Sequence, residues 1–200
     1  MMMVLWIIIA VFSGGLFGYL FLTPDSHSFL GTIVSVMLSL LIVSAGVDIG
    51  QNLGVMRSLL KRGHQVILVP ILLTIGSLIG GALASVILSM SLWEVLAVSS
   101  GVGWYSLTGP MITELYNIEL GTVGFLSNVI REISAFIMIP LVARVSYLAA
   151  IGPGGATTMD STLPVISRFT NPETSVIAFF GGFMLSFVPP VLIPLFLGWV

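Results

Sequence analysis

The chain has 200 residues, of which 57% are hydrophobic and only 7% are charged. An ordinary soluble domain carries roughly 25% charged residues, so this composition predicts an integral membrane protein. The formal net charge of −2 indicates no nucleic-acid partner, and the absence of cysteine excludes disulfides, thiolate catalysis and cysteine metal ligands. With two histidines and no phosphate-binding glycine motif, we expect no metal and no cofactor.

Two apolar stretches of membrane-spanning length come first, at about 3–22 and 29–47. The loop that follows them carries Arg57, Lys61 and Arg62. Because cytoplasmic loops are rich in Lys and Arg, this loop is predicted to be cytoplasmic, which places the N-terminus inside as well.

A third span is expected at about 65–89, and the pattern then changes over 93–117, WEVLAVSSGVGWYSLTGPMITELYN. Glycine, hydroxyl residues and proline interrupt an apolar helix there. Backbone groups freed in this way cannot be satisfied by lipid, so the segment must be covered by protein or line a polar cavity. The sequence therefore predicts a broken helix or a re-entrant hairpin.

The next element, about 121–148, places Asn128, Arg131 and Glu132 inside an apolar run. An ionisable side chain in hydrocarbon costs about 2.5 to 3.5 kcal/mol on insertion scales, which makes it a functional candidate. Asn128 and Glu132 share a helix face, whereas Arg131 and Glu132 are about 100° apart and need separate partners. Two interpretations stay open, namely a polar transport site and internal contacts that fix helix packing.

A second interruption is predicted at 150–171, where GPGGATTMDSTLPVI repeats the order of glycines, hydroxyls and proline seen in GVGWYSLTGPMI. Paired interruptions are a sequence sign of a transporter's binding site, although two polar loops outside the membrane are the alternative. A last span, about 174–199, is bent by Pro189, Pro190 and Pro194.

The predicted fold is thus an all-α polytopic membrane protein, a single transmembrane domain over 1–200. It has about five spanning helices plus the two broken or re-entrant segments, with the N-terminus inside and the C-terminus outside. If both interrupted segments are re-entrant, Arg144 lies on the cytoplasmic side, as the positive-inside rule favours.

The chemistry of these segments fits an amino acid. Helix N-termini after Gly109 and after Ser161 would attract a carboxylate, and the acids Glu132 and Asp160 would attract an ammonium group or a proton. Further candidate contacts are hydroxyl and aromatic side chains of the two interrupted segments: Tyr105, Ser106, Thr108, Thr157 and Thr158.

Enzyme interpretations are weaker. Intramembrane serine proteolysis needs a histidine beside the serine, yet His27 and His64 lie in polar loops. An aspartyl protease would need Asp48 and Asp160 to share a proton, and a valine precedes Asp48 where such proteases have glycine. A transporter for another amino acid or an organic anion is the other alternative.

Three stretches, SSGVGWYSLTGPMITE, FLSNVIREISAFIMIP and GGATTMDSTLPV, together resemble the core of the LysO-type lysine exporters, in order over nearly the whole chain. The resemblance implies an inner- or plasma-membrane protein that exports L-lysine and toxic lysine analogues in exchange for protons. The family's functional acids correspond to Glu132 and Asp160. Longer family members carry further spans before this region, which implies a homo-oligomer or a small membrane partner that supplies them.

Overall fold

The computed structural model describes residues 63–200 together with residues 9, 13, 14, 16–18, 20 and 36. The predicted spans at about 3–22 and 29–47 fall largely outside the described residues, as do Asp48 and the basic loop. Within 63–200 the chain forms helices and no strand, which agrees with the predicted all-α class.

Three helical stretches in the described part are long and apolar enough to cross a membrane. They are α4 (Gly63–Ser85), α7 (Ile118–Val142) and the pair α9 (Pro172–Leu185) and α10 (Val188–Leu197). These stretches contain 23, 25 and 26 residues, so each can cross about 30 Å of hydrocarbon. The chain is therefore a multi-pass membrane protein.

The stretch formed by α9 and α10 is interrupted where the sequence predicts a bend. Ser186 and Phe187 separate the two helices, and Pro189 stands in the first turn of α10. Proline lacks the amide hydrogen that the preceding turn needs, so it is tolerated at a helix start and disrupts a helix interior.

Two short helices form a hairpin between α4 and α7. They are α5 (Leu92–Ser99) and α6 (Tyr105–Leu115), joined by residues 100–104. The Tyr116 hydroxyl donates a hydrogen bond of 3.1 Å to Glu94, and so ties the end of α6 to the start of α5. This bond to the carboxylate also raises the pKa of the exposed Tyr116 phenol. The tip of the hairpin is the 100–104 connection, at the far end from that tie.

The prediction of a helix start after Gly109 is wrong, because α6 already begins at Tyr105 and contains both Gly109 and Pro110. The glycine serves packing instead. A Cβ atom at Gly109 would lie 2.7 Å from the Cβ of Phe125 on α7, so only glycine lets the two helices approach this closely.

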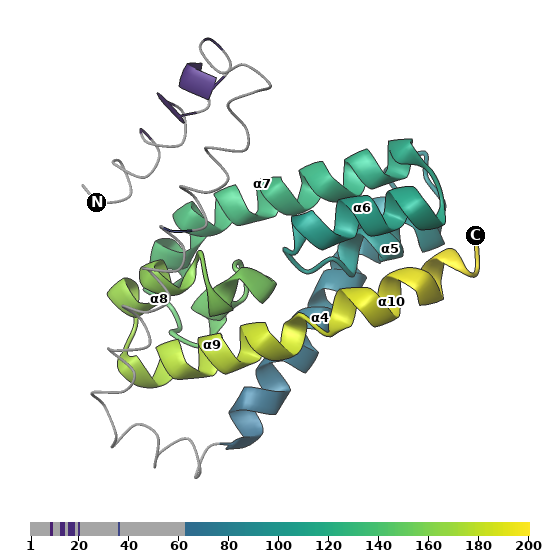
Figure 1. Ribbon diagram of the computed structural model, residues 1–200. Coiled ribbons are helices and arrows are strands. Elements are labelled where there is room, and N and C mark those ends of the chain that lie inside the picture. The colour runs from purple at the N-terminus through teal and green to yellow at the C-terminus, as the bar shows by residue number, and fades with distance from the viewer. Residues whose placement is uncertain (1–8, 10–12, 15, 19, 21–35, 37–62) are drawn as a thin grey trace.

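A second folded-back segment follows α7. It contains the 3₁₀ turns η2 (Ala149–Ile151) and η3 (Gly155–Met159) and the helix α8 (Leu163–Phe169). In α8 a proline occupies the first turn, and Asn171 then caps α9 by accepting a 2.8 Å hydrogen bond from the Thr174 amide. Figure 1 shows α5 and α6 towards one end of the molecule and α8 towards the other, with α7 along one side and α9–α10 along the other.

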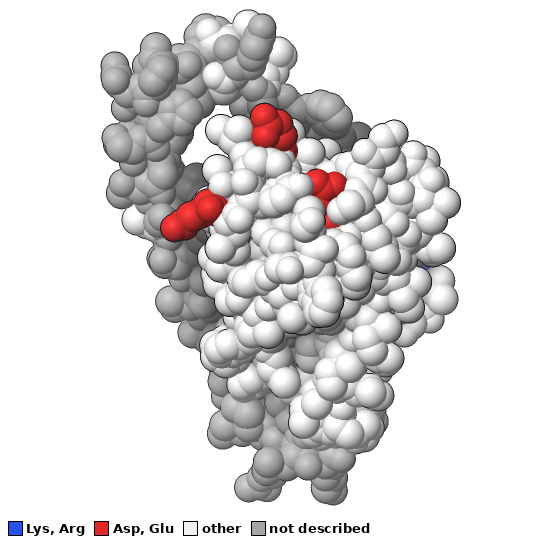
Figure 2. All heavy atoms as spheres, turned by 90° about the vertical axis from the view of Figure 1, so that its right-hand side faces the viewer, with Lys and Arg blue, Asp and Glu red and all other residues white. Residues whose placement is uncertain are grey.

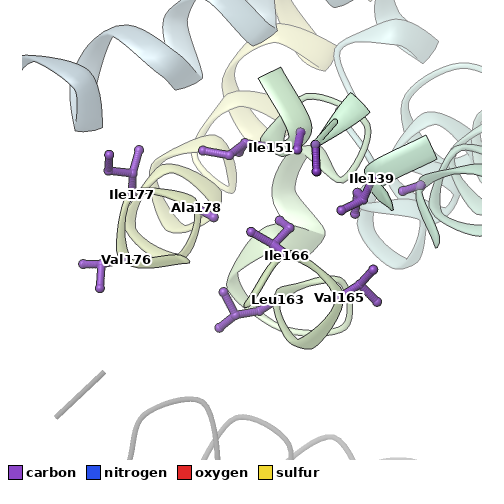
Figure 3. Close-up of a cluster of buried hydrophobic side chains, with 11 residues drawn as sticks. Ile139, Ile151, Leu163, Val165, Ile166, Val176, Ile177 and Ala178 are labelled. Carbon is purple, nitrogen blue, oxygen red and sulfur yellow. The ribbon is translucent and has the colours of Figure 1, made fainter. Parts of the chain in front are cut away.

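The largest apolar core holds α8 in place. Its fully buried members include Ile139 of α7, Ile151 of η2, Ile166 of α8 and Ile177 of α9. In Figure 3 the side chains of α8 lie between those of α9 and those of α7. This cluster, which we call the α8 core, fixes the second folded-back segment against both long helices.

The two ends of the described molecule differ in charge. The end formed by the start of α5, the end of α6 and the start of α7 carries Glu94, Glu114 and Glu119. Figure 2 faces this end and shows acidic side chains on its surface. Arg144 and Arg168 belong instead to the end where α7 and α8 finish.

Candidate transport site

The tips of the two folded-back segments touch each other. The Ala156 amide donates a 2.9 Å hydrogen bond to the Val102 carbonyl. Gly155 has φ of +61°, and a Cβ atom there would lie 2.2 Å from the same carbonyl oxygen. Gly103, with φ of +101°, would place a Cβ atom 3.0 Å from the Gly154 carbonyl. Glycine on both sides therefore permits the contact.

Val102 sits at this contact in an unusual backbone conformation. Its φ is 42° and its side chain is 1% exposed. The left-handed region is a genuine outlier for a β-branched residue, and such strain persists only where the surroundings enforce it. Nothing in the sequence pattern singled out this residue.

Asn128 satisfies the backbone groups of the first tip. Its Oδ1 accepts a 2.7 Å hydrogen bond from the Gly103 amide, and its Nδ2 donates to the carbonyls of Val98 and Gly124 at 3.3 and 2.9 Å. The side chain is only 4% exposed. Because a buried amide without a partner is costly, Asn128 fixes the first tip to α7.

Arg131 bonds in the same way to backbone groups at the tip of the second folded-back segment. Its guanidinium donates to the carbonyls of Pro153 and Gly152 at 3.4 and 3.3 Å, and to the Ser77 hydroxyl at 3.1 Å. Ser77 on α4 in turn donates to the Ser99 carbonyl at the end of α5. Sequence reasoning missed Ser77, whose only signal is a hydroxyl group in a glycine-containing apolar span.

The buried threonines of both segments also bond to backbone. Thr108 donates to the Trp104 carbonyl at 2.7 Å, Thr157 to Gly154 at 2.9 Å, and Thr158 to both Gly155 and Ala178 at 2.8 Å. Most of these bonds run three or four residues back along the same segment, and the Trp104 and Gly154 carbonyls also accept backbone amides. Thr158 is the exception, since its second bond joins η3 to the Ala178 carbonyl of α9.

Glu132 and Asp160 come together through Ser161. The Ser161 hydroxyl donates to Glu132, and the Ser161 amide donates a 2.5 Å hydrogen bond to Asp160 Oδ1. The two carboxyls are close enough for their charges to interact. Neither has a Lys or Arg partner among residues 63–200. Ser161 was absent from the predicted contacts, although it follows Asp160 directly.

Tyr105 lies beside this pair of acids and Ser106 is exposed. The Tyr105 ring packs edge-on against Phe125, with centroids 5.5 Å apart, and its phenol is within electrostatic reach of both Glu132 and Asp160. Ser106 is an exposed residue of α6. The structure therefore groups Glu132, Asp160, Ser161 and Tyr105. Asn128 and Arg131 hold the tips, whereas the three threonines bond to protein backbone.

No group of three or more His, Asp or Glu side chains that could hold a metal ion occurs in the described ranges. The polar groups at the centre are instead two carboxyls, a hydroxyl and a phenol, which suit ammonium groups and protons.

Membrane-length helices around two interrupted segments and a half-buried acid pair define a multi-pass membrane protein with a polar centre. The family described as "Lysine exporter LysO" matches residues 8–197, so the chain belongs to that family. It is a family of transporters, not of enzymes, and the intramembrane protease alternative is set aside.

Two relatives are named as a lysine exporter and a putative lysine exporter. The chain is 33% identical over 190 residues to "Lysine exporter LysO" of Escherichia coli, covering 95% of this chain and 62% of that protein. It is 33% identical over 156 residues to a "Putative lysine exporter" of Haemophilus influenzae, covering 78% of this chain and 80% of that protein. No solved structure matches the chain.

Proposed function

We propose that this chain exports L-lysine and toxic lysine analogues by proton antiport through a site that contains Glu132 and Asp160. The observation that carries the proposal is the joining of these two acids through Ser161 with no basic partner among residues 63–200. A pair of carboxyls without a counter-ion attracts a cation or a proton, and lysine carries two ammonium groups. The names of both relatives support lysine as the substrate.

The coupling follows from the same acids. A carboxyl can hold a proton or an ammonium group but not both, so binding of one favours release of the other. Export driven by inward proton flow then requires the acids to face each side of the membrane in turn. Tyr105 lies beside the acids and would cover the aliphatic part of the substrate.

The two folded-back segments are proposed to re-enter the membrane from opposite faces. Support comes from the α5–α6 hairpin, whose ends meet at Glu94 and Tyr116, and from the contact of its tip with Gly155 and Ala156. Parting of the tips would open the site to one side. The charge difference between the ends supports an intracellular position for Arg144 and an external C-terminus, in the plasma or inner membrane.

Lysine flux from proteoliposomes that contain the purified chain tests the proposal, with and without a pH gradient. Glu132→Gln and Asp160→Asn keep the size of each side chain and remove its charge, so each is expected to abolish lysine export. The matched control is Glu119→Gln, which removes an exposed acid from the first turn of α7. Wild-type flux from both acid variants would reject the site.

A competition panel of lysine, other amino acids and organic anions distinguishes lysine export from transport of another substrate by the same architecture. The predicted homo-oligomer, or a small membrane partner with further spans, stays a prediction. Native mass spectrometry of the detergent-solubilised protein tests that part.

A further inference from the structure

A separate polar cavity lies at the end of the molecule that carries Arg144. Its volume is about 580 Å³, within the range of about 300 to 1,000 Å³ typical of small-ligand sites. The side chains that give it its chemistry are Gln65, Arg144, Tyr147, Asn171, Glu173 and Thr174. They come from the start of α4, the turn after α7 and the start of α9.

Two of these side chains have unused hydrogen-bonding capacity. The Oε1 atom of Gln65 is buried and accepts no hydrogen bond. The Arg144 guanidinium has no ion pair or hydrogen bond to any of the residues that the structure describes. A buried acceptor without a donor is costly, and a bound ligand that supplies the donor removes that cost.

This cavity is distinct from the pair formed by Glu132 and Asp160. Arg144 directly follows Ala143, the C-cap of α7, and comes twelve residues after Glu132, which corresponds to about 18 Å of helical rise. Ala143 and Ile177 line the cavity and also belong to the α8 core shown in Figure 3, so apolar side chains form its floor.

We propose that the Arg144 cavity binds a free α-amino acid as a zwitterion, as a second substrate site of the transporter. The carboxylate pairs with the Arg144 guanidinium, and the α-ammonium group donates to Gln65 Oε1 and to the Glu173 carboxylate. Tyr147 covers the first part of the substrate side chain. The identification of the amino acid as lysine rests on the proposed function, whereas the zwitterion site itself does not.

The charges of the cavity favour a zwitterion over a simple anion. Arg144 and Glu173 present one positive and one negative group to the same space. The N-terminus of α9 adds a partial positive charge on the side of Asn171, which favours a carboxylate nearby. An inorganic anion would place a second negative charge beside Glu173. A polyamine would place a second positive charge beside Arg144.

Equilibrium binding of radiolabelled L-lysine to the purified full chain tests the site. The Glu132→Gln/Asp160→Asn double variant removes the central acids, and it is expected to retain saturable lysine binding. Adding Arg144→Gln, or Glu173→Gln, to that background is expected to weaken binding at least tenfold. The matched addition is Arg168→Gln, an exposed arginine of α8 outside the cavity, which is expected to leave affinity unchanged.

Chemical variants of the ligand sharpen the result. Lysine methyl ester lacks the carboxylate and Nα-acetyl-lysine lacks the α-ammonium group, so both are expected to compete at least tenfold more weakly than lysine for the double variant. Unchanged affinity after Arg144→Gln overturns the site, as does equal competition by the methyl ester. Failure of the folded double variant to bind any amino acid of a panel also overturns it.

Transport in the otherwise wild-type chain gives a second measurement if the double variant is not monodisperse on size exclusion. Arg144→Gln is expected to raise the KM for export at least tenfold, and an unchanged KM rejects the site. If lysine is exported and its affinity is the same with and without Arg144, the inference fails and the proposed function stands. If another amino acid binds in an Arg144-dependent way and lysine is not exported, the site stands and the proposed substrate fails.

Discussion

Gly155→Ala is expected to separate the two tips on which the central site depends. Gly155 has φ of +61°, a conformation that costs an L-residue about 1 to 2 kcal/mol. The added Cβ atom would lie 2.2 Å from the Val102 carbonyl oxygen and 3.1 Å from its carbon, and both are backbone atoms that no rotamer change can move. The tips must therefore part, at an overpacking cost of about 1 to 3 kcal/mol.

The same movement stretches the 2.9 Å hydrogen bond between Ala156 and Val102, which is worth about 0.5 to 1.5 kcal/mol. Together these costs predict that Gly155→Ala lowers the free energy of unfolding by about 2.5 to 6.5 kcal/mol and abolishes lysine export. The assays are denaturant unfolding in detergent micelles and lysine flux from proteoliposomes.

Gly181→Ala is the matched control, since it places the same methyl group inside α9. There the added Cβ atom meets only Pro70 Cδ at 3.8 Å, which is an ordinary contact. Alanine is about 1 kcal/mol better than glycine in a helix interior, so stability is expected to stay equal or rise. Wild-type stability and export from Gly155→Ala would refute the reasoning about the tip contact.

Three further substitutions test the groups that hold the centre. Asn128→Ala leaves the Gly103 amide buried without a partner, so we expect the free energy of unfolding, measured with denaturant, to fall by about 1 to 3 kcal/mol. The control Ser127→Ala changes an exposed neighbouring residue and is expected to have no comparable effect. Arg131→Lys keeps the charge but lacks the planar guanidinium that reaches three partners. We expect the free energy of unfolding to fall by about 3 kcal/mol in the same assay. A wild-type unfolding curve would show that the guanidinium geometry is unimportant. Ser161→Ala removes the hydroxyl between the two acids, and lysine flux is expected to fall at least tenfold with recovery in Ser161→Thr; full flux from the alanine variant would count against the bridge.

The sequence alone was enough for the class of protein and for the position of its unusual segments. Apolar runs of spanning length depend on composition, and α4, α7 and the α9–α10 stretch lie close to the predicted ranges. The helix is also interrupted within both 93–117 and 150–171, at the glycine-containing stretches 100–104 and 152–155, because glycine acts on its own turn of the chain. Pro110, in contrast, lies inside α6. That these segments re-enter the membrane stays a prediction.

The free-energy cost of placing charged side chains in a membrane likewise identified α7 as a functional candidate from the sequence alone. The spacing of Arg131 and Glu132 required separate partners, and the structure supplies them in different segments. Their identity could not be predicted, since the Gly103 amide is 25 residues from Asn128 and Ser77 is 54 residues from Arg131.

Only the tertiary structure decided which of the polar residues hold the fold and which form the candidate site. As polar residues in apolar segments, Asn128 and the threonines were equally good candidates for substrate contacts, yet their hydrogen bonds go to backbone groups of the protein. Local sequence specifies where a helix ends, whereas the partners of its freed backbone depend on how distant segments pack. For the same reason, the need for glycine at 155 became apparent only once its neighbour across the tip, Val102, was known.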